Sequence, residues 1–397
     1  MCHMPTLSRD TAVAVIGAGA MGSGIAQVAA TAGHPVALVD AVTGAVEEAV
    51  ARIIASLQRQ EAKGRISSAQ LEEIVERITP VESVAGLPRC GLVVEAVRED
   101  LETKRALFTR VAASQPADAV LATNTSSLDI TAIAAGIPGP DRVIGLHFFN
   151  PPAAMRLVEV IGGAESAAEV LEGATELMRA WGKAPVRCTS TPGFIVNRVA
   201  RPFYGEAQRM LMDGVADAAT LDAAVRSAGF RMGPLELTDF IGQDVNLAVG
   251  TSVWEQTGRD ERYTPTTFQQ DLVAAGRLGR KSGRGVYTYA ADGSVDGAEP
   301  DVELAERLVG GPVATDPLAR TLAMIVNEAV DLVARGEASP DDVDTAMRLG
   351  TRYPTGPLAW GREIGFDVVA RQLAELDEAY PGGRYRPSPA LTDGSIT

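Results

Sequence analysis

Short apolar runs alternate with longer mixed stretches through the first half of this chain. The runs at 12–16, 35–39, 91–97 and 119–123 contain few polar residues and are separated by segments with helical spacing. Such runs are typical of parallel strands that are buried on both faces. The alternation predicts an α/β fold with a doubly wound, mostly parallel sheet.

Two further apolar runs, at 142–149 and 155–160, flank a turn that contains two prolines. A hairpin folded about this turn would place His147 opposite Glu159, with Cβ atoms about 5 Å apart. The pattern therefore predicts that the last strands of the sheet run antiparallel, and that they hold an imidazole beside a carboxylate.

Residues 43–78 form a charged stretch with helical spacing between the second and third apolar runs. The stretch is longer than a plain crossover between neighbouring strands requires. We expect it to form a helical arm or lid over a binding cleft. It contains Ser56 and the Lys63-Gly64 pair.

The first apolar run leads into Gly17-Ala18-Gly19-Ala20-Met21-Gly22, and a small-residue helix is expected from Ser23 to about Ala32. Glycines in such a loop permit a tight turn and the close approach of a pyrophosphate. An acid at the end of the second run accepts the ribose hydroxyls of NAD and repels the 2′-phosphate of NADP. The order of features predicts a Rossmann-type domain that binds NAD through Gly17, Gly19, Ala20, Met21, Gly22 and Asp40.

After Pro192-Gly193 the spacing becomes helical, and parts of the pattern occur twice. The segment 214–226 recurs at 336–348, and the segment 233–245 recurs at 356–368, with coinciding glycines, prolines and aspartates. The nearly equal offsets predict a duplicated all-α domain. We expect an NAD-binding domain at 1–188, a first helical copy at 189–290, a linker with one short helix at 291–316, and a second, degenerate copy at 317–397.

Composition narrows the partners and the compartment. The formal net charge of −15 argues against nucleic acid or an anionic membrane as the partner. No uninterrupted apolar run is long enough to span a bilayer. Cys2, Cys90 and Cys188 are too far apart to suggest a disulfide framework, so the chain fits a reducing cytoplasm.

The basic residues comprise 32 arginines and only four lysines, which are Lys63, Lys104, Lys183 and Lys281. Because arginine serves for solubility nearly everywhere, the rare lysines could mark positions that need a compact point charge. Codon bias is the alternative. Lys104 and Glu99 begin a helical segment beside a strand end, where ligands bind in such sheets, although a solvated pair on a helix face would look the same.

His147 is one of three histidines, and the other two have simple explanations. His3 lies near the N-terminus, and His34 lies in a turn ahead of a strand. A carboxylate beside an imidazole fixes its tautomer and stabilises the imidazolium. The pair formed with Glu159 suits a general base that removes a hydroxyl proton near a bound nicotinamide. A purely structural pair is the alternative.

Residues 1–290 resemble the NAD-dependent L-3-hydroxyacyl-CoA dehydrogenases. The matching motifs, in order and in spacing, are VIGAGAMGSGIA, VVEAV, NTSSL, GLHFFNPP, LVEVI, TPGFIVNRV, MGPLEL and GRKSGRGVY. HFFNP with TPGFIVNR is more diagnostic than the glycine loop. The doubled helical layout is similar to that of bacterial aerobic degradation enzymes, including the phenylacetate-pathway 3-hydroxyadipyl-CoA dehydrogenases.

The resemblance implies a role for each matching residue, and it implies no metal site. The catalytic positions are His147 as the base, Glu159 as its orienting partner, Ser126 for the substrate hydroxyl and Asn197 for the substrate carbonyl. The cofactor contacts fall on Asp40, Glu99, Lys104, Ser126 and Lys281, and the coenzyme A contacts fall on Ser56 and Lys63. The implied reaction is hydride transfer from C3 of an acyl-CoA substrate to NAD, which gives a 3-ketoacyl thioester.

The second helical copy departs from the family pattern. Ala319 stands where the first copy has Asn197, and Ala359 stands where it has Glu236. We therefore expect a packing partner without a catalytic asparagine. The resemblance implies that single-copy members pair through this domain between two chains. A fused copy could satisfy that face internally, although a homo-oligomer is also open.

Two other functions compete with an acyl-CoA dehydrogenase. One is a dehydrogenase of free hydroxy acids, similar to the gulonate 3-dehydrogenases, and the other is an idle dinucleotide-binding relative such as a crystallin-like protein. Ser56 and Lys63 favour a coenzyme A substrate over a free acid. The intact set of Ser126, His147, Glu159 and Asn197 weighs against an idle protein. Acyl-chain length stays open, and no basic residue for a dicarboxylyl tail can be assigned from the sequence.

Overall fold

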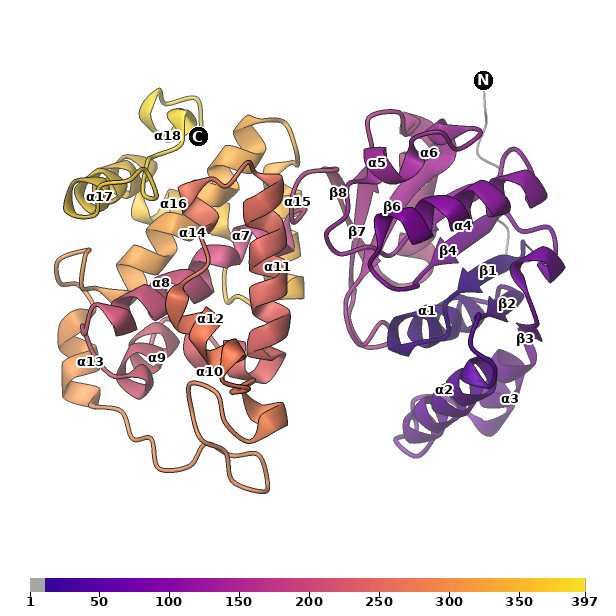
Figure 1. Cartoon of the computed structure of the whole chain (residues 1–397), viewed down its shortest axis with the longest axis horizontal. Coiled ribbons are helices and arrows are strands. Elements are labelled where there is room, and N and C mark those ends of the chain that lie inside the picture. Colours follow the sequence, from indigo (N-terminus) through magenta and orange to yellow (C-terminus); the bar gives the residue numbers. More distant parts are fainter. Residues whose placement is uncertain (1–10, 397) are drawn as a thin grey trace. The chain divides into compact units, whose positions relative to one another are not determined.

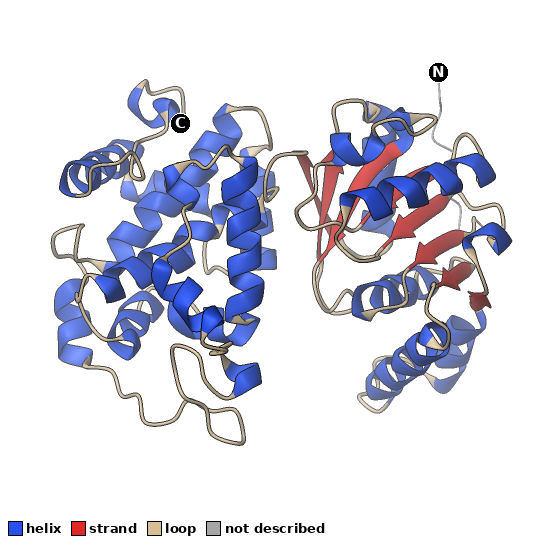
Figure 2. Cartoon of the chain, in the orientation of Figure 1, coloured by secondary structure: helices blue, strands red, loops and turns tan. Residues whose placement is uncertain are grey.

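The computed structural model describes residues 11–396, so Cys2 and His3 lie outside the described residues. The chain divides into two compact units, and the division falls between Phe194 and Ile195. The first unit combines a sheet with helices, whereas the second is built of helices (Figure 1, Figure 2). In the described part of the chain, no helix has both the length and the apolar character that a membrane crossing needs.

The first unit, which we call the α/β unit, is built on one eight-stranded sheet in the order β3-β2-β1-β4-β5-β6-β7-β8. The strands are β1 (Val13–Ile16), β2 (Val36–Val39), β3 (Ile78–Val81), β4 (Leu92–Glu95), β5 (Val120–Thr123), β6 (Val143–Phe148), β7 (Leu157–Gly162) and β8 (Ala184–Thr189). Strands β1 to β6 run parallel, β7 is antiparallel to β6, and β8 is parallel to β7. The predicted doubly wound sheet with antiparallel last strands is confirmed.

The helices of this unit lie between the strands in sequence. They are α1 (Ala20–Thr31), α2 (Ala45–Glu61), α3 (Ser68–Glu76), α4 (Leu101–Ser114), α5 (Ile130–Ala134) and α6 (Ala168–Ala180), with short 3-10 turns at Val84–Gly86 and Pro140–Arg142. Every residue of β1, β2, β4 and β5 is buried. This burial explains why their sequences are continuous apolar runs and not alternating patterns.

Several predicted boundaries shift by one to three residues, and two of the shifts have a clear physical cause. Helix α1 begins at Ala20, three residues earlier than expected, because Gly19 is its N-cap residue and the glycine loop leads straight into the helix. The arm expected at 43–78 consists of α2 and α3, but Ile78 belongs to β3. Only Ile78 is buried in this edge strand, which also contains Pro80, so it lacks the apolar run of a central strand.

The second unit, which we call the helical unit, contains two successive sets of helices. The first set is α7 (Val196–Val199), α8 (Arg201–Met212), α9 (Ala218–Arg226), α10 (Pro234–Ile241), α11 (Gln243–Gln256) and α12 (Thr267–Ala274), with 3-10 turns at Glu261–Tyr263 and Arg280–Ser282. Helix α13 (Val302–Leu308) follows and packs on α9. The second set is α14 (Pro317–Ala334), α15 (Pro340–Gly350), α16 (Pro357–Ile364), α17 (Phe366–Ala379) and α18 (Pro389–Thr392).

The same aspartate-to-helix contact occurs in both sets. Asp222 of α9 accepts hydrogen bonds from the backbone N–H of Leu235, at 2.9 Å, and of the next residue, at 2.8 Å. Asp344 of α15 accepts bonds from the backbone N–H of Leu358, at 2.7 Å, and of the residue after it, at 3.1 Å. These carboxylates satisfy the free N–H groups at the starts of α10 and α16. The repeated sequence thus corresponds to a repeated structure.

The two helical sets meet where α8 packs against α14, around a buried glutamate in each helix. Glu206 of α8 is fully buried, and its partners all come from the second set. Arg320 Nε donates to it at 2.8 Å, Arg384 Nε at 2.9 Å and the Tyr385 hydroxyl at 2.7 Å. Three donors with two positive charges therefore surround this carboxylate.

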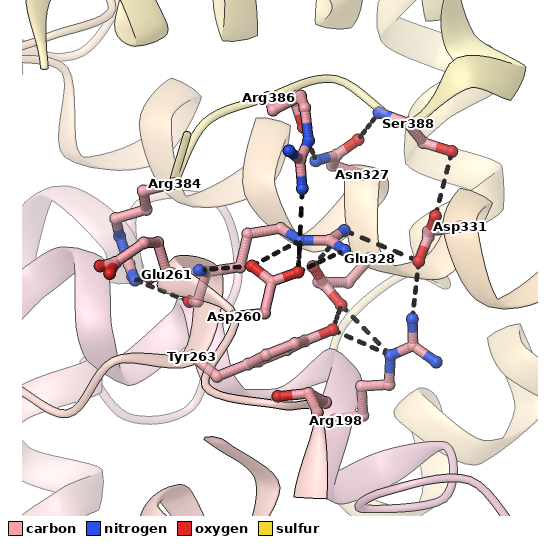
Figure 3. Close-up of polar contacts among 12 residues, drawn as sticks. Arg198, Asp260, Glu261, Tyr263, Asn327, Glu328, Asp331, Arg384, Arg386 and Ser388 are labelled. Carbon is pink, nitrogen blue, oxygen red and sulfur yellow. Dashed lines mark hydrogen bonds and ion pairs between the residues drawn. The ribbon is translucent and has the colours of Figure 1, made fainter. Parts of the chain in front are cut away.

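Glu328 of α14 has the mirror set of partners from the first helical set. The close-up shows Tyr263 donating to this carboxylate beside Arg198, whose Nε lies 3.3 Å from Oε2 (Figure 3). Arg262 Nη1 lies 3.2 Å from the other oxygen. Each of these residues stands 122 positions before its counterpart around Glu206. The contact is thus reciprocal, like an isologous contact between two identical subunits.

Candidate active site

Most of the residues singled out from the sequence lie along one edge of the sheet, where the parallel strands end. Gly17 follows β1, and Asp40 follows β2. Ser126 lies three residues after the end of β5, and His147 is the penultimate residue of β6. Ligands of open α/β sheets bind outside this carboxyl edge. The strand order places the glycine loop and Asp40 towards β3, and the His147 side chain towards β7.

The glycine loop is closed on its inner side and open on its outer side. A Cβ atom at Gly17, which has φ +103°, would lie 2.5 Å from the carbonyl oxygen of Ala96. A Cβ atom at Gly22 would lie 1.7 Å from the carbonyl oxygen of Gly17, so neither position accepts a side chain. A Cβ atom at Gly19 would have no other atom within 4 Å. The N-terminus of α1 therefore faces open space, as an approaching pyrophosphate requires.

Asp40 stands beside this loop. Its Oδ2 accepts a hydrogen bond from the backbone N–H of Ala18 at 2.6 Å, and its Oδ1 accepts one from Val42 at 2.8 Å. A cavity of about 400 Å³ is lined by Asp40, Gly19 and residues of α2, and another of about 450 Å³ is lined by 40–44 and 80–82. The loop and the acid together fit the pyrophosphate and a ribose of NAD.

A buried ion-pair group lies between the glycine loop and His147. Glu95, the last residue of β4, is fully buried and accepts hydrogen bonds from Lys104 Nζ at 2.7 and 2.9 Å and from Thr123 Oγ1 at 2.7 Å. Lys104 is 1% exposed, and its Nζ also lies 3.4 Å from Glu99 Oε2. This lysine therefore joins the carboxylate that ends β4 to a second carboxylate four residues later.

Glu99 connects that ion pair to the loop after β5. Its Oε1 accepts hydrogen bonds from the backbone N–H of Ser126, at 2.8 Å, and from the hydroxyl of Thr125, at 2.6 Å. Burial alone would raise the pKa of Glu99, but the charge of Lys104 and these hydrogen bonds outweigh it, so the pKa lies below its usual value. Glu99 is thus held ionised, and it positions the backbone around Ser126.

Two residues of this edge, Glu95 and Asn124, were not identified from the sequence. Glu95 is the one charged residue within the apolar run at 91–97, which was a usable signal because buried carboxylates need partners. Asn124 Oδ1 accepts a hydrogen bond from the backbone N–H of Phe148 at 2.8 Å. This bond ties the loop that carries Ser126 to the strand that carries His147.

His147 and Glu159 face each other across the β6–β7 hairpin, as predicted. They are direct partners in the strand register, and His147 Nδ1 lies 2.6 Å from Glu159 Oε2. The glutamate is fully buried and the histidine is 7% exposed, with the rings of Phe149 and Phe194 centred 4.5 and 5.9 Å away. Because Nδ1–H donates to the carboxylate, Nε2 carries the lone pair of the neutral ring.

The remaining predicted residues lie on the arm and in the helical unit. Ser56 is partly exposed on α2, and Lys63 is exposed just after that helix. Asn197 is partly exposed on α7, and its backbone carbonyl accepts a bond from Arg201 Nε at 2.8 Å. Lys281 forms an ion pair with an aspartate of α11 at 2.6 Å. Their ligand contacts stay predictions.

Comparisons with known proteins agree with this geometry. The sequence model described as 3-hydroxyacyl-CoA dehydrogenase, NAD binding domain, matches residues 12–191. The model described as 3-hydroxyacyl-CoA dehydrogenase, C-terminal domain, matches twice, at 193–289 and at 318–394. The NAD-binding match ends close to the division between the two units, and the double match follows the two helical sets.

Three similar proteins illustrate the match. The 3-hydroxyadipyl-CoA dehydrogenase of Escherichia coli (strain K12) is 43% identical, and the match covers 97% of each chain. The 3-hydroxybutyryl-CoA dehydrogenase of Clostridioides difficile is 39% identical over 70% of this chain and 99% of its own. The crystal structure of a 3-hydroxybutyryl-CoA dehydrogenase from Escherichia coli K12 has a TM-score of 0.88 and 42% identity, and covers 98% of both chains.

Proposed function

Because this chain belongs to the 3-hydroxyacyl-CoA dehydrogenase family and is an NAD-dependent oxidoreductase, we propose that His147 is the general base of its hydride transfer. The observation that carries this proposal is the buried 2.6 Å contact between His147 Nδ1 and Glu159 at the carboxyl edge of the sheet. The carboxylate leaves Nε2 free to accept the proton of the C3 hydroxyl, and it stabilises the imidazolium that forms.

The other residues bind and orient the reactants. NAD, when bound, supplies the nicotinamide ring that accepts the hydride from C3. Ser126 donates to the substrate hydroxyl, and Asn197 holds the substrate carbonyl. Asp40 and the glycine loop hold the dinucleotide, while Glu99, Lys104 and Lys281 complete its contacts. Ser56 and Lys63 on the arm bind coenzyme A. Aligning the reacting atoms in a dry site lowers the barrier that separated reactants would face.

We also propose a 3-hydroxydicarboxylyl-CoA as the substrate, with 3-hydroxyadipyl-CoA as its representative. The relative named for that activity is similar over 97% of each chain and therefore shares the doubled helical layout. The Clostridioides difficile relative, named for a butyryl thioester, matches 70% of this chain over 99% of its own length. The full-length crystal structure from Escherichia coli K12 is named for a butyryl thioester, so measured rates with the two thioesters decide between these substrates.

Oxidation of NADH tests the reaction class. We expect turnover with a 3-ketoacyl-CoA and much slower turnover with the matching free 3-keto acid, whereas equal rates would favour a dehydrogenase of free acids.

His147→Gln should lower kcat by roughly two to four orders of magnitude, because it removes the proton acceptor, while NADH still binds. The control is His34→Gln, since His34 bonds to the backbone of Thr11 at the other end of the sheet. Unchanged turnover in the His147 variant would refute the base.

The reciprocal contact between the helical sets supports a proposal on assembly. We propose that this contact replaces, within one chain, the contact that single-copy members make between two chains. A chain ending at residue 290 would leave Glu206 without its arginines and Arg198 without Glu328. We expect that truncated chain to associate or aggregate in light scattering. A soluble monomer would contradict the proposal.

A cytoplasmic location is the proposal that best fits the thiols. Cys90 and Cys188 are buried, and burial raises the pKa of Cys90 to about 11. A thiol held protonated in this way is unreactive. Cell fractionation would test the location: dehydrogenase activity should follow the cytoplasmic marker enzymes, and activity in an exported fraction would contradict it.

A further inference from the structure

Arg201, which is partly exposed, differs from the four arginines that form ion pairs between the two helical sets. The side chains of Arg198, Arg262, Arg320 and Arg384 are 11% exposed or less, and each has a carboxylate within 3.3 Å. Arg201 instead donates from Nε to the carbonyl of Asn197 at 2.8 Å and from Nη1 to the carbonyl of Asn246 at 3.2 Å. Among the described residues, no carboxylate lies within ion-pair distance of its guanidinium.

The surroundings of Arg201 do not compensate its charge. Its guanidinium carbon lies 4.9 Å from the ring centre of Tyr204. Burial lowers the pKa of Arg201, and the nearby groups that counteract this are two tyrosines, Tyr204 and Tyr353, rather than acids. An arginine stays charged in proteins, so this partly exposed site holds a cation that has no carboxylate within ion-pair distance in the described chain. Three of its five N–H donors also have no partner in the described chain.

Arg201 lines a small cavity whose free polar groups are donors. The cavity has a volume of about 40 Å³ and lies among α8, α11 and α12. Gln208 also lines it and is 2% exposed; its Oε1 accepts a bond from Thr266, but its Nε2 has no partner. Gly250 also lines this wall, and a Cβ there would make only an ordinary contact with Arg201, at 3.7 Å. The space holds roughly three waters or one carboxylate group.

The position of Arg201 along the helix suits a six-carbon diacid. It follows Asn197 by four residues, across the junction between α7 and α8, where four helical residues advance the backbone by about 6 Å. In an extended adipyl chain, five carbon–carbon bonds separate the thioester carbonyl from the terminal carboxyl carbon, which is also about 6 Å. If Asn197 holds the carbonyl, the far end of the chain reaches the level of Arg201.

We propose that Arg201 binds the terminal carboxylate of a 3-hydroxydicarboxylyl-CoA, with Gln208 as a second donor, and so selects diacid thioesters over thioesters that end in a methyl group. The inference rests on the proposed function, because it takes Asn197 as the residue that holds the substrate carbonyl. A carboxylate supplies the missing counter-charge through charge-assisted hydrogen bonds. A methyl group would leave the cation and the Gln208 amide unpaired.

A matched pair of substrates isolates this effect. 3-Ketoadipyl-CoA and 3-ketohexanoyl-CoA have the same six-carbon chain and differ only in a terminal carboxylate or methyl group. We expect wild-type kcat/KM, followed by NADH consumption, to be higher for the adipyl thioester. Arg201→Met should lower the adipyl-to-hexanoyl ratio about 100-fold, because it removes a charged donor that only the diacid needs. Arg201→Lys should give an intermediate ratio, since it keeps the charge and loses the planar fork.

Two further variants control the measurement. Arg371→Met removes the same charge from α17, where the side chain is 69% exposed, and should leave the ratio within about twofold of wild type. Gln208→Glu adds a carboxylate to the same cavity and should lower the ratio about tenfold by competing for Arg201. This variant also keeps the inference testable if Arg201→Met does not fold, which circular dichroism would reveal.

The outcomes separate the inference from the function on which it rests. Wild-type enzyme that turns over neither thioester would contradict the dehydrogenase proposal itself. A wild-type preference for the hexanoyl thioester would contradict the diacid substrate, and the inference with it. A third outcome would overturn the inference alone. In it, Arg201→Met lowers kcat/KM equally for both thioesters, and Gln208→Glu leaves the adipyl-to-hexanoyl ratio unchanged. Arg201 would then only support the backbone of Asn197.

Discussion

The two helical copies differ in their first helices. The first copy starts with the short helix α7, which carries Asn197, and continues into α8. The second copy has one continuous helix, α14, with Ala319 at the corresponding position. Beyond that point both copies keep the aspartate that binds the next helix start, at Asp222 and Asp344. Duplication has therefore preserved the residues that pack and pair, but not the residue expected to hold a substrate.

The paired charge clusters are reciprocal but not equal. Around Glu206, the charges of Arg384, Arg320 and Arg209 outweigh the effect of burial and lower its pKa to about 2. Around Glu328, the arginines have additional acids: Arg198 also binds Asp331 at 2.7 Å and Glu337 at 2.5 Å. The first cluster therefore depends mainly on Glu206, with Asp213 Oδ2 at 3.6 Å from Arg320 as a weaker partner, whereas the second distributes its negative charge over several close carboxylates.

The largest expected effect follows from that inequality. Glu206→Gln should destabilise the chain by about 3–5 kcal/mol, because three arginines lose their main counter-charge in a buried site. Glu328→Gln should cost about 1–3 kcal/mol, since other carboxylates remain beside Arg198. Urea unfolding followed by circular dichroism measures both. Glu303→Gln, at a side chain that is 92% exposed, is the matched control and should stay within about 0.5 kcal/mol. Equal losses of unfolding free energy in Glu206→Gln and Glu328→Gln would contradict the difference between the two charge clusters.

The next largest expected effect is a loss of catalytic activity. Asn197→Ala should lower kcat/KM about 100-fold, because a misplaced substrate carbonyl disturbs the alignment of the reacting carbon. Ala319→Asn restores the residue in the second copy, where it is partly exposed on α14, and should change neither activity nor stability measurably. NADH consumption with a 3-ketoacyl-CoA compares the two. A tenfold change in the Ala319 variant would show that the second copy does more than pack.

The smallest effect is a pH dependence. Burial raises the pKa of Asp222 to about 6, despite its hydrogen bonds, and the usual value is 3.8. The folded chain thus binds this proton more tightly than the unfolded chain, so its contribution favours folding at low pH and is lost as pH rises from about 4 to about 6. The loss is at most on the order of 3 kcal/mol.

Asp222→Asn should flatten that part of the stability profile, measured by urea unfolding between pH 4 and pH 7. Asp344, its counterpart, also has a raised pKa because of burial, but it is partly exposed. Asp344→Asn should therefore flatten the profile less. An identical profile in wild type and Asp222→Asn would mean that this carboxyl does not titrate in that range.

The sequence predicted the central strands and the His147–Glu159 pair because local patterns encode them. Runs such as β1 and β2 are apolar throughout, since both faces are covered. The pairing of His147 with Glu159 follows from the position of the turn between two apolar runs. Strands β3 and β8 carry no such run, because they lie at the two edges of the sheet and are only partly buried. Edge strands therefore lacked the signal that identified the others.

Contacts between distant segments were harder to predict. The Glu95–Lys104 pair joins a strand end to a helix, and nothing in the local spacing shows that the lysine turns inward. The pairing of Arg198 with Glu328 spans 130 positions. Both residues belong to the duplicated region, but the recurring segments that revealed the duplication begin after Arg198, so they did not include this pair. Extending the 122-residue offset to charged residues would have found both clusters.

The reciprocal contact has a consequence for the amount of enzyme that a cell needs. Two subunits that pair between chains separate when the protein is diluted below their dissociation constant. Here the partner surface belongs to the same polypeptide, so its effective concentration is set by the connecting segment and not by expression level. The specific activity of this protein should consequently stay constant from micromolar to picomolar solutions, where a dimer that depends on its partner would lose it.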